Sequence, residues 1–268
     1  MEAISLMPKD PAWFLYRYLG QAIHDYRMIS EGDSILLGIS GGKDSLYMAY
    51  ALDKLRRRSP VKFNLAAITI NPGEPSGFTP EELETLRKIF ESMDIQHHVV
   101  PTHIAKIVEE YPTGKSACSL CANLRRGALY KAANELGYKK VALAHHLDDA
   151  IETLLLNMFY QSRCRCFEPV THLTRRDVFV IRPLVYTPEK DIILVAGKLG
   201  LPVIKTRCPV AGTTCRQEMK DLVKLLSHKI PNIRNNMRGV LKDLWMNKPR
   251  VSQGEAEEGV FEPEESAV

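Results

Sequence analysis

The sequence predicts an α/β protein with a mostly parallel sheet that is covered by helices on both faces. Strand-like and helix-like segments alternate along most of the 268 residues, as expected for consecutive β–α–β units. The strand-like segments are almost continuously apolar, as in Ser34–Ile39 (SILLGI) and Asn64–Ile70 (NLAAITI). Such strands are typical of a sheet buried on both faces, and the length allows one domain or two small ones.

The individual elements follow from short apolar runs and from helical spacing. Strands are predicted at Ser34–Ile39, Asn64–Ile70, Ile95–Val100, Lys140–Ala144, Val178–Arg182 and Pro202–Lys205. Helices are predicted after Ser45 to about Arg57, at Pro80–Met93, Ile104–Tyr111, Ala122–Leu136, Asp149–Tyr160 and Glu189–Lys198, around Met219–Leu226, and from Pro231 to about Trp245. Asp149–Tyr160 is the clearest helix, because its apolar residues recur at intervals of three and four.

The composition divides the chain into four parts. Residues 1–30 are expected to form a helical extension, 31–210 the main domain, and 211–248 helices packed on it, while the glutamate-rich tail 249–268 is expected to be disordered. The longest apolar runs are too short to span a membrane. Asp10 and Pro11 stand where a signal peptide would be apolar. We therefore expect a cytoplasmic protein with no membrane partner.

A glycine-rich motif between the first strand and its helix is the strongest chemical signal. It consists of Ser40, Gly41, Gly42, Lys43, Asp44 and Ser45. Glycines let the backbone N–H groups turn toward an anion, and the helix N-terminus adds partial positive charge. The motif is not a Walker A loop, because Asp44 stands where that loop needs Ser or Thr. An acidic residue in a phosphate loop suits a metal ion or another part of a nucleotide; a ligand-free glycine turn is the alternative.

Six cysteines indicate a metal or redox site in a cytosolic chain. They are Cys118, Cys121, Cys164, Cys166, Cys208 and Cys215. Cys118 and Cys121 form a C-x-x-C pair, which zinc, iron–sulfur clusters and redox dithiols all use. Cys208 is able to supply a third ligand. Buried inert thiols are the alternative, above all for Cys164, Cys166 and Cys215.

An acidic pair, Asp148 and Asp149, follows a predicted strand and opens a helix. Carboxylates are stabilised at helix N-termini, and Asp149 with Glu152 fits a capping box. Capping does not require the second aspartate, nor the preceding His145 and His146, which could line a pocket. The functional interpretation is a Mg²⁺ or base-activating site that faces the phosphate loop across the carboxyl ends of the strands.

Positive charge predicts a polyanionic partner. The net charge is +4 although residues 251–268 contain six glutamates and no Lys or Arg. Arg125 and Arg126 adjoin the C-x-x-C pair, and Arg234, Arg238 and Lys242 recur every four residues on the last predicted helix. Such side chains suit RNA phosphates and unpaired bases; solvated helix faces show the same pattern.

The motifs together resemble a known family. Ser40–Ser45 (SGGKDS) resembles the PP-loop of the ATP pyrophosphatases, which cleave ATP between its α- and β-phosphates and adenylate a carbonyl oxygen. Four further segments, in order, resemble the tRNA 2-thiocytidine synthetase family. They are Cys118–Gly127 (CSLCANLRRG), Ala144–Asp149 (AHHLDD), Leu155–Tyr160 (LLNMFY) and Ile181–Leu184 (IRPL). The resemblance spans roughly residues 14–245.

The resemblance implies a Rossmann-type PP-loop fold, similar to the adenine nucleotide alpha-hydrolases, and an ATP-dependent tRNA sulfurtransferase that acts on a pyrimidine C2 oxygen, that of cytidine. It implies that Ser40, Gly41, Gly42, Lys43 and Ser45 cradle the departing pyrophosphate, that Asp44 acts through Mg²⁺, and that Asp148 and Asp149 are catalytic. Cys118, Cys121 and Cys208 would hold a [4Fe–4S] cluster whose open iron carries sulfur. The implied partners are tRNA, a sulfur donor such as a cysteine desulfurase or free sulfide, and a second copy of the chain.

Two departures from the family pattern keep other functions open. Gln161–Cys166 replaces a usual Gly-Gly-Lys stretch, and the C-x-x-C that the family tends to have at its third-ligand site keeps only the first cysteine, Cys208. The alternatives are another PP-loop tRNA-modifying transferase, of the 2-thiouridine or lysidine type, and a non-enzymatic iron–sulfur RNA-binding module. A lysidine synthetase would not need the three cysteines. The uridine thiolases with zinc ribbons need cysteines before Cys118, where this chain has none. The intact Lys43 and Asp44 argue against a module without activity.

Overall fold

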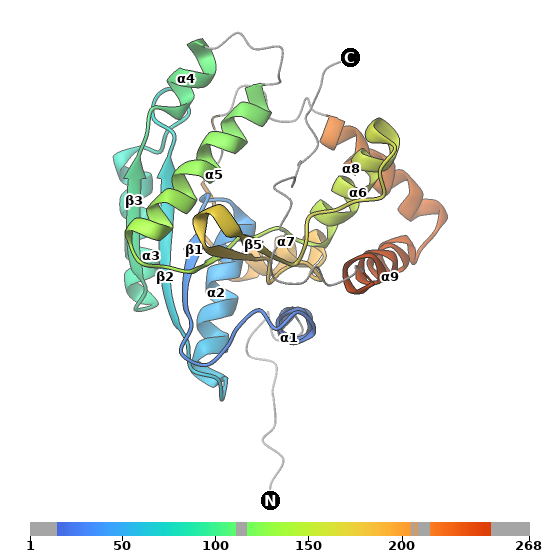
Figure 1. Ribbon diagram of the computed structural model, residues 1–268, viewed down its shortest axis with the longest axis horizontal. Helices are drawn as coiled ribbons and strands as arrows, with labels where there is room; N and C mark the ends of the chain where they lie inside the picture. Colours follow the sequence, from blue (N-terminus) through green and yellow to red (C-terminus); the bar gives the residue numbers. More distant parts are fainter. Residues whose placement is uncertain (1–14, 111–116, 205–206, 208–214, 248–268) are drawn as a thin grey trace, which may run out of the picture.

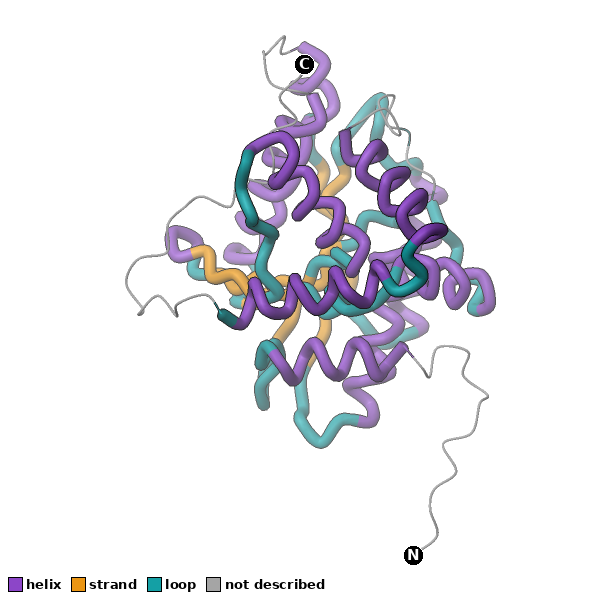
Figure 2. The backbone as a smooth tube through the Cα atoms, turned by 90° about the vertical axis from the view of Figure 1, so that its right-hand side faces the viewer, coloured by secondary structure: helices purple, strands orange, loops and turns teal. Residues whose placement is uncertain are grey.

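The computed structural model describes residues 15–110, 117–204, 207 and 215–247. They form one six-stranded sheet in the order β3-β2-β1-β4-β6-β5, enclosed between helices (Figures 1 and 2). The strands are β1 (Ser34–Gly38), β2 (Asn64–Asn71), β3 (Gln96–Pro101), β4 (Lys140–Ala142), β5 (Val170–Leu173) and β6 (Val178–Ile181). The predicted α/β class with a mostly parallel sheet is confirmed.

Helices cover both faces of the sheet, which explains the continuous apolar strands. The helices are α1 (Leu15–Asp25), α2 (Lys43–Arg58), α3 (Pro80–Ser92), α4 (Ile104–Glu110), α5 (Ala117–Glu135), α6 (Leu147–Gln161), α7 (Glu189–Lys198), α8 (Cys215–Lys229) and α9 (Ile233–Met246). On one face, Leu36 of β1 packs in a cluster with α4 and α5. Its neighbours Ile35 and Leu37 join the larger core on the opposite face.

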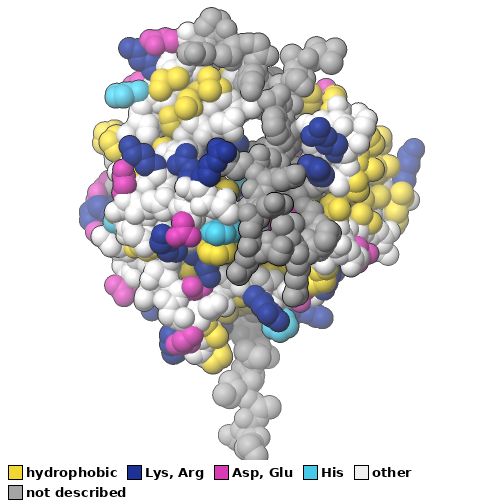
Figure 3. All heavy atoms as spheres, in the orientation of Figure 1, with side chains coloured by type: hydrophobic (Ala, Val, Ile, Leu, Met, Phe, Trp, Pro, Cys, Tyr) yellow, Lys and Arg dark blue, Asp and Glu magenta, His cyan; other side chains and the backbone are white. Residues whose placement is uncertain are grey.

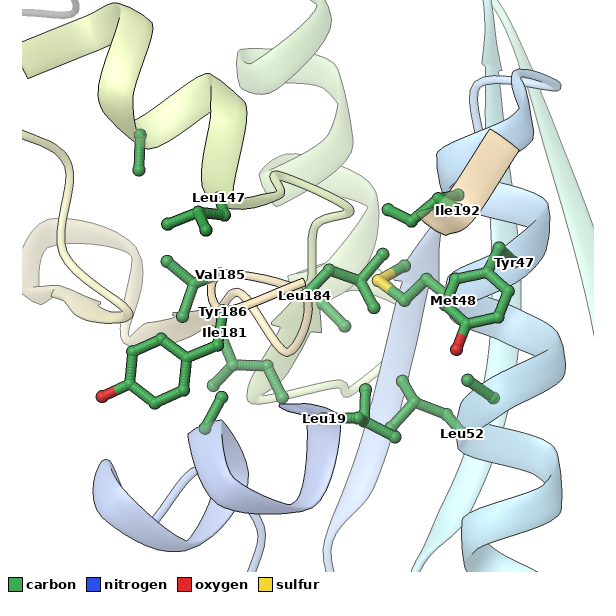
Figure 4. Close-up of a cluster of buried hydrophobic side chains, with 14 of the residues drawn as sticks. Leu19, Tyr47, Met48, Leu52, Leu147, Ile181, Leu184, Val185, Tyr186 and Ile192 are labelled. Carbon is green, nitrogen blue, oxygen red and sulfur yellow. The ribbon is translucent and has the colours of Figure 1, made fainter. Parts of the chain in front are cut away.

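The larger core ties distant parts of the chain into one body. Leu19 of α1, Met48 of α2 and Tyr186 before α7 meet in it (Figure 4). Trp245 of α9 also belongs to this core, and its indole N–H donates to the carbonyl of Phe167 at 2.8 Å. The N-terminal and C-terminal helices are therefore packed on the main domain. None of the described helices is long and apolar enough to cross a membrane.

Three local features differ from the sequence prediction. Pro202–Ile204 is a loop and not a strand, and the N–H of Ile204 donates to the carbonyl of Gly41 at 3.0 Å. β5 pairs antiparallel with β6 and was not predicted, because its VTHL sequence is polar in part and lies at the sheet edge. Helix α5 begins five residues earlier than expected, at Ala117, so the C-x-x-C pair lies on a helix.

The strand order places a topological switch point beside β1. The chain runs from β1 to β2 and β3 on one side, and then crosses to β4 on the other side of β1. Both neighbours are parallel to β1, so the segments after β1 and β4 leave the same edge of the sheet. Ligands of open α/β sheets bind at such a point, and the phosphate loop and the acidic pair are these two segments.

Candidate active site

The loop after β1 has the backbone of an anion-binding turn. Gly41 has φ +77°, and a Cβ there would lie 3.0 Å from a ring carbon of Phe78. Gly42 caps α2 without any side-chain hydrogen bond to the helix. The Ser45 hydroxyl donates to the Gly42 carbonyl at 2.9 Å and accepts from the Ser40 N–H at 3.2 Å. These bonds hold the loop at the N-terminus of α2, whose partial positive charge suits an anionic ligand.

Lys43 is held between two carboxylates. Its ammonium donates to Asp44 Oδ2 and to Glu189 Oε1, both at 3.0 Å. Burial by itself would lower the pKa of Lys43, but Asp44 and Glu189 outweigh it and raise the pKa above its ordinary value. The lysine is therefore a fixed positive charge at the loop.

The acidic pair divides into two different environments. Asp148 is buried and accepts from the Glu189 N–H and from Arg234 Nε, both at 2.7 Å. Each of its oxygens is thus used to join α6 to α7 and α9. Asp149 instead lines a small cavity next to the phosphate loop. The predicted Mg²⁺ or base-activating role suits Asp149 better than Asp148.

His146 caps α6, where the sequence suggested a box formed by Asp149 and Glu152. His146 Nδ1 accepts from the Asp149 N–H at 3.2 Å, and Asp149 Oδ2 accepts from the His146 N–H at 2.9 Å. An accepting Nδ1 leaves the ring proton of a neutral imidazole on Nε2, which lies 3.8 Å from Asp44 Oδ1. The cap therefore links the α6 terminus to the phosphate loop.

A small charged cavity of about 220 Å³ adjoins the loop. It is lined by Asp44, His146, Asp149, Glu152, Glu189, Arg216, Gln217 and Lys220. Glu152 is buried, and this burial together with the charge of Asp149 raises its pKa to about 8. Glu152, Glu189, Arg216 and Lys220 were not predicted as site residues. The spacing of Glu152 three residues after Asp149 was a signal for that residue.

A larger cavity of about 630 Å³ joins the phosphate loop to the cysteine pair. Lys43 and Asp44 line it at the loop, Phe78 and Ile204 form an apolar wall, and other lining residues include Cys118, Cys121 and Arg125 of α5. The phosphate loop and the cysteine-bearing start of α5, which are distant in the sequence, therefore line one cavity.

The other cysteines differ in their surroundings. Cys208 lies outside the described residues. Cys166 is buried and donates to the Ala150 carbonyl at 3.4 Å, and burial raises the pKa of its thiol to about 12. Cys164 is exposed, whereas Cys215 is half-buried at the start of α8.

The two predicted basic surfaces, on α5 and on α9, differ in the contacts that their side chains make. Lys and Arg side chains gather over α5 and near α8 (Figure 3). On α9, by contrast, Arg234 bonds to Asp148, Lys242 pairs with Asp25 at 2.8 Å, and Arg238 lies over the Tyr18 ring. Each of the three cations of the α9 stripe thus contacts another part of the same chain, and the contact of this stripe with RNA stays a prediction.

The donor set fits a magnesium ion that is shared with a nucleotide. Asp44 Oδ1 is buried without a hydrogen-bond partner among the described residues, so it has a lone pair for a cation. Within the same residues, no group of three or more His, Cys, Asp or Glu is placed to hold a metal ion. Mg²⁺ usually takes one or two carboxylates and completes its shell with phosphates and water, so the Asp44 carboxylate suits it as a protein ligand.

A glycine-rich phosphate loop with an internal aspartate, placed at the switch point of a parallel sheet, defines a PP-loop protein. The PP-loop domain family matches residues 15–204.

The chain belongs more closely to the tRNA-cytidine(32) 2-sulfurtransferase family. The protein of that name from Pelobacter propionicus is 42% identical over 229 residues, which cover 84% of each chain. The one from Geobacter metallireducens is 41% identical over 87% of this chain and 89% of its own. Among solved structures, the U34-tRNA thiolase NcsA from Methanococcus maripaludis with its [4Fe-4S] cluster has a TM-score of 0.70 and 23% identity, covering 91% of this chain and 82% of that chain. That likeness concerns the fold.

Proposed function

We propose that the protein is an ATP-dependent tRNA sulfurtransferase. It adenylates the C2 oxygen of a cytidine and replaces that oxygen with sulfur. The observation that carries the proposal is the single cavity that joins the phosphate loop to Cys118 and Cys121. Activation by ATP and delivery of sulfur need to reach the same base, and a shared cavity allows both. The names of the family's members support tRNA cytidine as the substrate.

The loop residues would bind and orient ATP. The N-terminus of α2 with Ser40, Gly41, Gly42, Lys43 and Ser45 stabilises the negative charge of the departing pyrophosphate. Asp44 would hold Mg²⁺ through Oδ1, which accepts no hydrogen bond from the described residues. Phe78 and Ile204 offer an apolar wall for the adenine ring. Asp149 lines the small cavity, which supports a role for this carboxylate in assisting near the phosphates.

The sulfur side would use Cys118, Cys121 and Cys208 to hold a [4Fe–4S] cluster. When bound, the cluster would carry a sulfur atom taken from the donor and deliver it to the activated base. Arg125 lines the cavity beside the thiols, where it would contact an RNA phosphate or stack on the target base. The proposed partners are tRNA, a cysteine desulfurase or free sulfide as donor, and a second copy of the chain, in the cytoplasm.

Mass spectrometry of tRNA nucleosides tests the proposal. Cells that lack the gene should lose 2-thiocytidine, and the wild-type gene, but not its Cys118→Ala or Lys43→Ala variant, should restore it. Loss of 2-thiouridine or of lysidine instead would assign the chain to another PP-loop reaction. An unchanged nucleoside profile would favour an RNA-binding module without activity.

A further inference from the structure

One carboxylate joins the phosphate loop to a helix near the C-terminus. Glu189 Oε1 accepts from Lys43 Nζ and from Lys220 Nζ, each at 3.0 Å, and Glu189 Oε2 lies 2.8 Å from Lys220 Nζ. Lys43 begins α2, Glu189 begins α7, and Lys220 lies on α8. Three separate elements therefore meet at one internal anion beside the loop.

This anion holds together two positive charges that would otherwise repel each other. Burial would raise the pKa of Glu189, but the bonds from Lys220 and Lys43 lower it to about 2, so the group is ionised. Arg216, one turn earlier on α8, lines the same cavity and lies 3.7 Å from Asp149 Oδ1. The wall that α8 presents to the loop is thus cationic, with its charge neutralised by carboxylates.

We propose that α8 forms the second wall of the phosphate site: Lys220 contacts the terminal phosphates of ATP and the pyrophosphate product, and Glu189 competes with them for Lys43 and Lys220. This inference rests on the proposed use of ATP and adds residues outside the loop to it. Ammonium groups bind phosphate and carboxylate oxygens by the same charge-assisted hydrogen bonds. A phosphate can therefore replace the carboxylate without leaving either lysine unpaired.

The proposal predicts effects of opposite sign at two residues that contact each other. Removing Lys220 removes a phosphate ligand and weakens pyrophosphate binding. Neutralising Glu189 removes the competing anion and strengthens binding. A merely structural ion pair would give the same sign for both substitutions, because either one breaks the same contact.

Calorimetry with inorganic pyrophosphate and magnesium, on the full chain, measures these effects. We expect Lys220→Ala to weaken binding about tenfold, Lys220→Arg to restore most of it, and Glu189→Gln to tighten it about threefold or more. Lys224→Ala is the matched control, because Lys224 is exposed one turn further along α8. Circular dichroism and thermal unfolding of each variant report whether it folds.

The outcomes separate this inference from the proposed function. If the wild-type protein binds no pyrophosphate, or if Lys43→Ala binds it as well as wild type, the proposed ATP site is wrong. If wild type binds at the loop but Lys220→Ala behaves like Lys224→Ala, only the α8 wall is overturned. If a folded Glu189→Gln variant binds pyrophosphate more weakly than wild type, Glu189 does not compete with phosphate for the two lysines.

Discussion

Asp44 lies at the junction of the two cavities and uses its two oxygens differently. Oδ2 accepts from Lys43, whereas Oδ1 is buried without a hydrogen-bond partner among the described residues. Asp44→Asn keeps the shape but removes the negative charge that would hold Mg²⁺. We expect AMP formation in the presence of tRNA to fall about 100-fold or more, with iron content and tRNA affinity unchanged. Release of AMP at the wild-type rate would exclude the assigned role.

The six cysteines should separate into two groups. Cys118 and Cys121 line the large cavity, and Cys208 is the predicted third ligand. Single alanine variants of these three should lose the cluster spectrum and tRNA thiolation after anaerobic reconstitution. Alanine variants of Cys164, Cys166 and Cys215 should keep both.

Cys166 provides a sharp control for this separation. Cys166→Ala removes a buried bond to the Ala150 carbonyl, so it should lower the free energy of unfolding by about 1 kcal/mol without loss of iron. An inactive, cluster-free but folded Cys166→Ala variant, or a fully active Cys208→Ala variant, would contradict the assignment.

Glu152 gives the fold a dependence on pH. Burial and Asp149 raise its pKa from 4.5 to about 8, so the folded state favours the protonated carboxyl. Its unfolded pKa is lower, so the protein should lose stability as pH rises from about 4.5 to 8. Glu152→Gln mimics the neutral acid. Urea unfolding should show this variant more stable than wild type by about 1–3 kcal/mol at pH 8, and nearly equal at pH 5. An equal difference at both pH values would show that Glu152 does not titrate in this range.

The residues of the site were predictable where a local motif marks them. The phosphate loop and the C-x-x-C pair are contiguous in sequence, and both line the large cavity. Glu189 and Lys220 join the site only because α7 and α8 pack beside α2 and α6, and such long-range contacts leave no local pattern. The adjacent Asp148 and Asp149 look alike in sequence, but the positions of Arg234 and of the Glu189 N–H distinguish them.

At the scale of elements, α9 illustrates how a basic stripe can stabilise a fold. Arg234 joins α9 to Asp148 at the start of α6, and Asp148 is only 8% exposed. Arg234→Ala leaves that carboxylate without its cation, so the free energy of unfolding should fall by about 1–3 kcal/mol. Arg238→Ala, which removes a contact with the Tyr18 ring, should cost about 0.5–1 kcal/mol. Urea unfolding compares the two.

The same variants test the predicted RNA contact of this stripe. If tRNA affinity falls more for Arg238→Ala than for Arg234→Ala, and both proteins are folded, the stripe touches RNA through its outward side. If Arg234→Ala costs no more stability than Arg238→Ala, the ion pair with Asp148 does not hold α9 in place.

The predicted secondary structure is correct where a strand is buried on both faces of the sheet. β1 and β2 are buried along nearly their whole length, so their apolar runs identify them. Pro202–Ile204 is also apolar, but its first two residues are exposed, and Ile204 packs beside the phosphate loop, where its N–H donates to the Gly41 carbonyl. Hydrophobicity alone does not distinguish a strand from a loop that seals a site. The α5 start was missed because its first residues are cysteines and small polar residues.

At the scale of the whole molecule, the site is assembled from segments that are far apart in the sequence. The loop after β1 and the segment after β4 meet at the switch point, α5 brings the thiols, and α8 closes the small cavity with Arg216 and Lys220. On the face shown in Figure 3, basic side chains gather over α5 and near α8, the two helices that contribute to the cavities. This arrangement suits a folded RNA that presents one base to the large cavity while its backbone contacts the surrounding surface.

Binding of tRNA should therefore weaken steeply with salt, because each phosphate contact releases counterions. Arg125 lines the large cavity and Arg126 follows it on α5, so we expect the double Arg125→Ala, Arg126→Ala variant to bind tRNA more weakly. Its slope of log affinity against log salt should flatten by about 1–2. Lys139→Ala is the control. Lys139 directly precedes β4, so it lies at the amino ends of the strands, opposite the carboxyl ends where the site lies, and it pairs with Asp177. Filter binding over a range of salt concentrations measures both variants, and a slope equal to that of the Lys139 control would place the RNA surface elsewhere than on α5.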